Sequence, residues 1–118
     1  MSGFKDLKVW KKAHNLTLEI YKITKEFPKN ERYRLVDQLC RSTASVPANI
    51  AEGKGRKSTK EFSNFLNIAR GSIEETKYHL LLSKDLGYLN EEEFNKIWSK
   101  AREVGKMLNG LISKLEIN

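Results

Sequence analysis

Apolar residues recur at helical spacing along nearly the whole chain of 118 residues. The first such stripe, with steps of three and four, is formed by Val9, Ala13, Leu16, Ile20, Ile23 and Phe27. This spacing places side chains on one face of an α-helix. Pro28 follows the stripe, and proline disrupts a helix because it lacks an amide hydrogen. The pattern therefore predicts a first helix over residues 6–27.

The second stripe predicts a helix over residues 31–53 and is formed by Val36, Leu39, Thr43, Val46 and Ile50. Gly53 follows it, and glycine is the residue most typical of helix C-caps. Pro47 lies inside this segment. We expect it to kink or break the helix near residues 43–46.

Start and stop residues delimit two more helices, over residues 58–87 and 90–116. Ser58 and Glu61 have the spacing of a capping box, and Gly87 is placed to end the third helix. Asn90 precedes three glutamates, which suit the positive end of a helix dipole. The fourth helix repeats apolar residues every seven positions, as in Phe94, Ala101, Leu108 and Leu115, which is typical of supercoiled packing. Four helices with short connections predict one all-α domain over residues 1–118, an antiparallel up-down-up-down four-helix bundle.

Two of the predicted helices carry more apolar residues than one bundle core requires. A second stripe in the first helix contains Trp10 and Tyr21, and a third track in the fourth contains Trp98 and Ile112. Exposed apolar surplus usually marks an interface, so we expect a closed homo-oligomer. Asn49 and Glu52 lie three residues apart on one helix face, where they serve either an interface or the fold itself. The candidate interface residues are Trp10, Tyr21, Asn49, Glu52, Trp98 and Ile112.

Several classes of function have little support in the sequence. Cys40 is the only cysteine, and no apolar run has the length of a signal peptide or membrane span, so we expect a cytoplasmic protein without membrane contact. His14, His79 and Cys40 are isolated from one another, without the spacing of metal ligands. No nucleophile motif or acid–base pair is evident. We expect no enzyme, no metal, no cofactor and no small-molecule substrate.

Positive charge is concentrated in the first half of the chain. Residues 1–60 carry 14 Lys and Arg against 6 Asp and Glu, whereas residues 61–118 carry 8 against 9, giving +7 overall. Such a distribution suits either a polyanionic partner or simple solubility. Lys54, Arg56, Lys57 and Lys60 surround the predicted helix start at Ser58, where free amides attract anions. This loop is either a phosphate site or a solvated connection, and the scarcity of aromatic residues among these cations argues against base stacking.

Several ordered motifs resemble one known family. They are Leu7–Trp10 (LKVW), Phe27-Pro28, Ser45–Gly53 (SVPANIAEG), Gly55-Arg56, Glu61-Phe62, 65–72 (FLNIARGS) and 86–89 (LGYL). Together they are similar to the four-helix-bundle proteins encoded in intervening sequences of bacterial 23S ribosomal RNA genes. The resemblance implies a ring, typically a homopentamer. Distant relatives are accessory proteins of diversity-generating retroelements and bind nucleic acid.

The resemblance leaves two functions open. The first is a non-enzymatic homo-oligomer that binds RNA or DNA phosphates through Lys54, Arg56, Lys57, Lys60 and Arg41. Arg41 is the weaker candidate, because the family often has two arginines where this chain has Cys40-Arg41. The second is a protein–protein interaction scaffold with no role in nucleic-acid binding.

Overall fold

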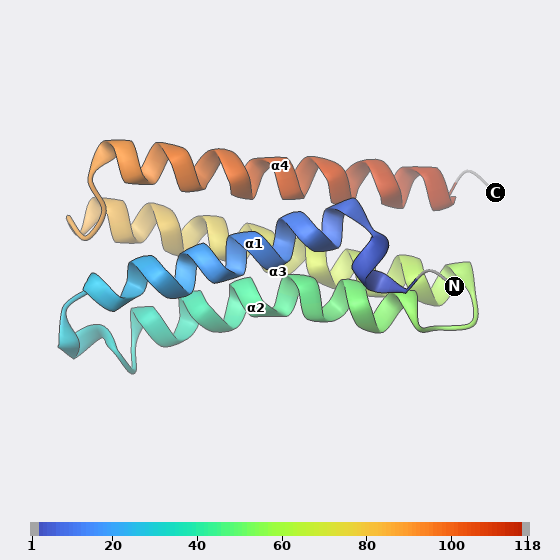
Figure 1. The fold of residues 1–118 in the computed structure, drawn as a ribbon, viewed down its shortest axis with the longest axis horizontal. Helices are drawn as coiled ribbons and strands as arrows, with labels where there is room; N and C mark the ends of the chain where they lie inside the picture. The colour runs from blue at the N-terminus through green and yellow to red at the C-terminus, as the bar shows by residue number, and fades with distance from the viewer. Residues whose placement is uncertain (1–2, 117–118) are drawn as a thin grey trace.

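Four long helices make up most of the computed structural model, which describes residues 3–116. The helices are α1 (Lys8–Ile23), α2 (Leu35–Lys54), α3 (Thr59–Asp85) and α4 (Glu91–Glu116). They run alternately up and down (Figure 1), each packs against the next, and α1 also contacts α4. The bundle measures 46 × 22 × 21 Å, and no strand occurs within residues 3–116. The predicted all-α antiparallel four-helix bundle is confirmed.

Three of the predicted capping residues, Ser58, Gly87 and Asn90, lie at helix ends as the sequence predicts. Ser58 Oγ accepts a hydrogen bond from the Glu61 amide at 3.1 Å. Asn90 Oδ1 accepts one from the Glu93 amide at 2.8 Å, and the Glu93 carboxylate accepts the Asn90 amide at 3.0 Å. Gly87 has a φ of +86°, the left-handed conformation that terminates helices with little strain only in glycine. Local chemistry therefore fixes both ends of the α3–α4 connection.

The connection between α1 and α2 is longer than predicted. α1 ends at Ile23 and continues as a 3-10 turn over Thr24–Glu26, and α2 begins only at Leu35. Phe27 is extended, with φ −71° and ψ 155°, as expected for a residue before proline. Glu31, predicted to begin the second helix, is buried and accepts a hydrogen bond from the Tyr88 hydroxyl at 2.7 Å. This contact to another loop holds Glu31 outside the helix.

Pro47 does not break α2, which is continuous from Leu35 to Lys54. Because proline has no amide hydrogen, the carbonyl of Thr43 loses its usual donor within the helix. The Thr17 hydroxyl of α1 lies 3.0 Å from that carbonyl and 2.9 Å from the Ala13 carbonyl of its own helix, so its one hydrogen is shared between the two acceptors. The predicted break is wrong because α2 is continuous, and Thr17 offers the Thr43 carbonyl a donor from another helix.

Gly53 is not the C-cap of α2 but a point of close contact inside its last turn. A Cβ atom at Gly53 would lie 2.7 Å from the Cβ of Phe65 and 3.0 Å from the ring of Phe62. Both phenylalanines belong to α3. The glycine therefore allows α2 and α3 to approach more closely than any side chain would permit.

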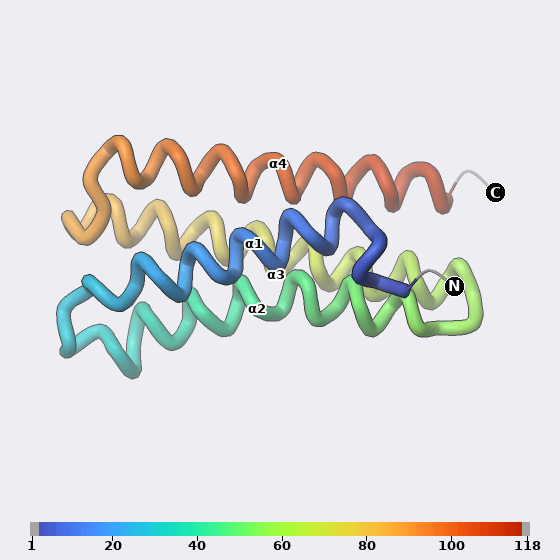
Figure 2. Tube along the Cα trace, viewed as in Figure 1, coloured from blue at the N-terminus to red at the C-terminus, as the bar shows by residue number. Residues whose placement is uncertain are grey.

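The core is aliphatic, with hydroxyl groups linking its helices. Its large, fully buried apolar side chains are Leu16, Ile20, Leu39, Val46, Ile50, Leu66, Ile73, Leu80, Val104 and Leu108. Between α2 and α3, the Thr76 hydroxyl donates to Ser42 Oγ at 3.0 Å, and the hydroxyls of Ser45 and Ser72 lie 2.9 Å apart. These contacts fix α2 relative to α3. The trace in Figure 2 shows that their connecting loop lies at the same end as the start of α1 and the end of α4.

Candidate nucleic-acid interface

The short turn between α2 and α3 brings together four of the five predicted basic residues: Lys54, Arg56, Lys57 and Lys60. The Gly55 amide donates to the carbonyls of Ala51 and Glu52 at 3.3 and 3.2 Å. The Arg56 amide donates to the Gly53 carbonyl at 3.1 Å. Because these bonds satisfy the last carbonyls of α2, the chain reverses at once. The cations therefore share one end of the bundle.

The start of α3 carries both anion-attracting amides and a competing carboxylate. The Ser58 hydroxyl accepts a hydrogen bond from the Glu61 amide, and the Phe62 amide donates to the Ser58 carbonyl at 3.1 Å. The amides of Thr59 and Lys60 lie in the first turn of α3, before the first hydrogen bond within the helix, and form part of the positive end of its dipole. The Glu61 carboxylate accepts a hydrogen bond from the Ser58 hydroxyl at 3.1 Å. An incoming phosphate would share this position with one negative side chain.

Two of the four cations are held against aromatic rings. The Arg56 guanidinium lies 4.7 Å from the centre of the Phe65 ring and donates to the Glu52 carboxylate at 2.7 Å. The Lys54 ammonium lies 5.9 Å from the Phe62 ring centre. The sequence analysis missed both rings because they belong to the next helix and not to the basic segment. Both rings are half-buried beneath the cations, so Arg56 and Lys54 are positioned by packing.

Lys57 and Lys60 are the more available charges of the loop. Both side chains are exposed, and neither forms an ion pair within residues 3–116. Arg56, in contrast, shares its charge with Glu52. The pairing of Arg56 was not predictable from helical spacing, because Arg56 lies two residues beyond the end of α2.

Arg41 does not belong to the loop cluster. It lies thirteen residues before Lys54 in the same helix, or about 20 Å along the axis. Its Nε donates to both carboxylate oxygens of Asp37 at 3.1 Å. The structure therefore places Arg41 and the loop in different parts of the surface, and whether Arg41 contacts phosphate stays a separate prediction.

Three of the six predicted interface residues make their contacts within this chain. Ile112 is buried in the core with 3% of its surface exposed, so its assignment to an outer surface is wrong. The Asn49 side-chain amide donates to the Ser45 carbonyl at 2.8 Å and to its hydroxyl at 2.9 Å. Glu52 is paired with Arg56. Asn49 and Glu52 thus have partners without any second copy.

The other three candidates lie at the surface to different degrees. Trp10 is half-buried and stacks on His14 at 4.9 Å, and Trp98 is half-buried beneath the Lys77 ammonium at 5.2 Å. Tyr21 is 48% exposed. Sequence reasoning missed further exposed apolar residues, namely Leu18 on α1 and Ile68, Tyr78 and Leu81 on α3. Each of these four residues lies outside the apolar stripe that faces the core. An apolar residue outside that stripe is the sequence signal that would have identified them.

Comparison with known proteins places this bundle in a family. The family model described as 23S rRNA-intervening sequence protein matches residues 5–110. The chain belongs to the 23S rRNA-intervening sequence protein family. The matched range extends from the start of the fold into α4 and includes the whole α2–α3 turn. The family resemblance noted in the sequence motifs is therefore confirmed.

A solved member of the S23 ribosomal protein family from Bacteroides thetaiotaomicron, of unknown function, has a similar structure. Its sequence is 31% identical, the TM-score is 0.82, and the match covers 88% of this chain and 97% of that one. A comparison with curated proteins gave no match.

Two negative findings concern only the residues described. Within residues 3–116, no three His, Cys, Asp or Glu side chains gather as metal ligands would. None of the four long helices there combines the length and apolar character needed to cross a bilayer.

Proposed function

We propose that this member of the 23S rRNA-intervening sequence protein family is a non-enzymatic, self-associating protein that binds RNA or DNA through phosphate contacts at the α2–α3 turn. The single observation that carries the proposal is the placement of Lys54, Arg56, Lys57 and Lys60 around the amino end of α3. Free amides and a helix dipole at such an end favour a phosphate group. Backbone contacts of this kind carry no sequence information, so RNA and DNA of any sequence bind.

Lys57 and Lys60 provide the sharpest test of phosphate binding. Because both are exposed, the double variant Lys57→Gln/Lys60→Gln keeps the fold while removing two charges. For each subunit that contacts single-stranded nucleic acid, the slope of the logarithm of the binding constant against the logarithm of the salt concentration is expected to become less steep by about 1.4. The measurement is fluorescence anisotropy of labelled oligonucleotides over a salt series.

The matched control removes two exposed charges from the opposite end of the bundle. Lys22 and Lys96 lie near the end of α1 and the start of α4 and line one common hollow. The variant Lys22→Gln/Lys96→Gln is expected to bind almost as tightly as the parent. Equal weakening by both variants would mean that only the net charge matters. A parent that binds no oligonucleotide at low salt would favour the interaction-scaffold function instead.

Self-association is supported by the apolar side chains that the single bundle leaves exposed. Leu18 on α1 is 56% exposed and Ile68 on α3 is 53% exposed. Light scattering at micromolar concentration is expected to return a multiple of the 13.7 kDa chain mass, five-fold for the pentamer that the family resemblance implies. Leu18→Glu or Ile68→Glu is expected to lower that mass. The control variant Ser99→Glu, at an exposed position of α4, is expected to leave it unchanged. A mass near one chain for the parent would refute self-association.

A further inference from the structure

The hollow between the end of α1 and the start of α2 differs in charge from four other surface hollows. It contains Lys25, Lys29 and Arg32 and no acidic residue. Each of four other hollows is lined by at least one glutamate. Its volume is about 520 Å³, within the range of about 300–1,000 Å³ of small-molecule sites. It therefore combines the size of a ligand site with an excess of positive charge.

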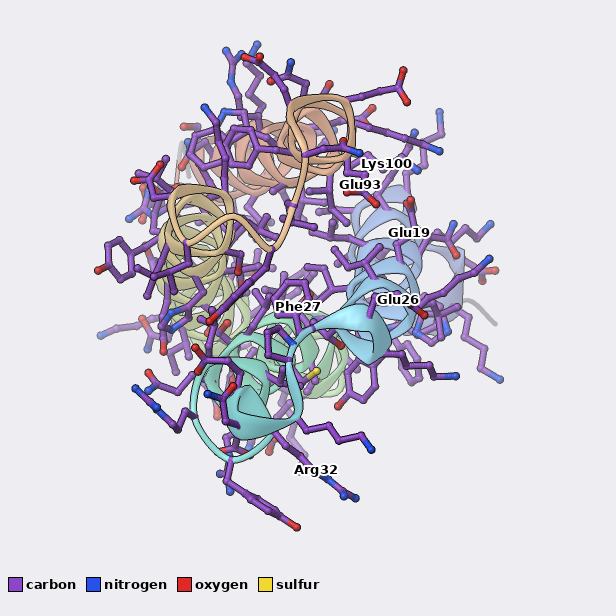
Figure 3. The ribbon with its side chains drawn as sticks, turned by 90° about the vertical axis from the view of Figure 1, so that its left-hand side faces the viewer. Glu19, Glu26, Phe27, Arg32, Glu93 and Lys100 are labelled. Carbon is purple, nitrogen blue, oxygen red and sulfur yellow. The ribbon has the colours of Figure 1, made fainter. Side chains whose placement is uncertain are left out.

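The interior of this hollow is mostly apolar. Val36 contributes half-buried hydrocarbon surface, Tyr21 contributes a half-exposed ring, and the thiol of Cys40 lies among them, while Phe27 is 7% exposed and closes the floor. The Phe27 ring also packs on the Tyr88 ring at 5.3 Å, so it is fixed in position. Figure 3 views this end of the bundle directly and shows Phe27 turned inward between the helices, whereas Arg32 extends outward. The hollow thus has an apolar interior and a cationic rim.

Among the described residues, the three rim cations are not paired with a carboxylate. Lys25, Lys29 and Arg32 form no ion pair within residues 3–116, although several other cations do. The Arg32 guanidinium lies 5.5 Å from the ring centre of Tyr33, a contact that leaves its positive charge uncompensated. Three uncompensated cations beside apolar surface attract a ligand that offers an anion and hydrocarbon together.

We propose that this hollow binds a small amphiphilic anion, with its hydrocarbon body against Tyr21, Val36 and Cys40 and its carboxylate or phosphate head at Lys29 and Arg32. This site lies at the opposite end of the bundle from the α2–α3 turn and does not depend on nucleic-acid binding. Both parts of the ligand are required, because neither the exposed cations nor the shallow apolar floor binds a small molecule tightly alone.

Calorimetry with five probes tests the requirement for both parts. Octanoate and octyl phosphate are each expected to bind at least ten-fold more tightly than 1-octanol, which lacks the charge, and than acetate or inorganic phosphate, which lack the hydrocarbon. The ratio between octanoate and octyl phosphate identifies the preferred head group. Binding of 1-octanol as tight as that of octanoate, or of inorganic phosphate as tight as that of octyl phosphate, would overturn the proposal.

The location is tested by charge-removing variants and by the reactivity of Cys40. Lys29→Gln/Arg32→Gln is expected to weaken octanoate binding at least ten-fold, whereas Lys57→Gln/Lys60→Gln at the other end leaves it unchanged. Burial raises the pKa of the Cys40 thiol, so alkylation by iodoacetamide is slow and is best followed at alkaline pH. Bound octanoate is expected to slow that reaction further. Equal loss in both variants, or alkylation unaffected at saturating octanoate, would place the ligand elsewhere and refute the site.

Discussion

Replacing Gly53 with alanine tests how closely α2 and α3 approach each other. The added methyl group would lie 2.7 Å from the Cβ of Phe65 and 3.3 Å from the carbonyl oxygen of Phe62. Neither atom is at the end of a flexible side chain, so the helices themselves have to separate by about 1 Å to restore ordinary contact. Overpacking of this kind costs about 1–3 kcal/mol.

The intrinsic preference of alanine for helices acts in the opposite direction. Gly-to-Ala replacement inside a helix contributes about 1 kcal/mol of stability. We therefore expect Gly53→Ala to lower the free energy of unfolding by about 0–2 kcal/mol. Gly71 is the matched control, because it is exposed in α3 and its added methyl group meets nothing within 4 Å. Gly71→Ala is expected to raise stability by about 1 kcal/mol.

The assay is thermal unfolding followed by circular dichroism, at several protein concentrations because oligomerisation shifts the midpoint. For a chain of 118 residues, 1 kcal/mol corresponds to about 4 °C. Gly53→Ala is therefore expected to unfold about 4–12 °C below Gly71→Ala. If the two variants are equally stabilised, the close contact between α2 and α3 does not exist, and the explanation for Gly53 is wrong.

Two further predictions concern hydrogen bonds between distant segments. Thr17→Val removes the donor to the Thr43 carbonyl and is expected to lower the free energy of unfolding in urea by about 1–3 kcal/mol. The loss is expected to be smaller in a Pro47→Ala background, where residue 47 regains a backbone amide. An equal loss in both backgrounds would exclude this role for Thr17. In the parent protein, the hydrogen bond to Glu31 raises the pKa of Tyr88, because only the neutral phenol can donate it. Tyr88→Phe removes this bond. The bond therefore stabilises the fold fully below about pH 10 and loses its effect as the pH rises through the raised pKa of Tyr88. Tyr88→Phe is expected to lower the melting temperature at pH 8 and to lose less stability than the parent above pH 10. Identical pH profiles of the two proteins would contradict the assignment.

Local patterns predicted what local chemistry decides. Ser58 and Asn90 begin their helices, and Gly87 ends one, through contacts within a few residues, so their roles are visible in the sequence. Gly53 and Pro47 were misinterpreted because their environment is supplied by another helix. The Cβ of Phe65 explains the first and the Thr17 hydroxyl explains the second, and neither contact is encoded in neighbouring residues.

The candidate site was predicted in part for the same reason. The sequence places Lys57 and Lys60 beside a helix start without knowledge of tertiary structure. The position of Phe65 beneath Arg56 depends on how α3 packs on α2, which no local pattern in the sequence indicates. Ile112 shows the limit of periodicity, because three adjacent apolar tracks in one helix do not indicate which of them faces the core. The exclusion of Arg41, in contrast, follows from the rise of a helix and was available from the start.

The hydrogen bond between Tyr88 and Glu31 makes two loops open as one unit. Tyr88 belongs to the α3–α4 connection and Glu31 to the α1–α2 connection, and 57 residues separate them in the chain. The hydrogen-bonded amides of both loops, such as those of Glu31 and Tyr88, are expected to exchange with solvent after this end of the bundle opens and to share one exchange rate. Among residues 3–116, the α2–α3 turn at the opposite end has no such link to them and is expected to exchange independently. The bundle thus has two ends whose motions are separately controlled, one closed by a contact between loops and one by a single tight turn.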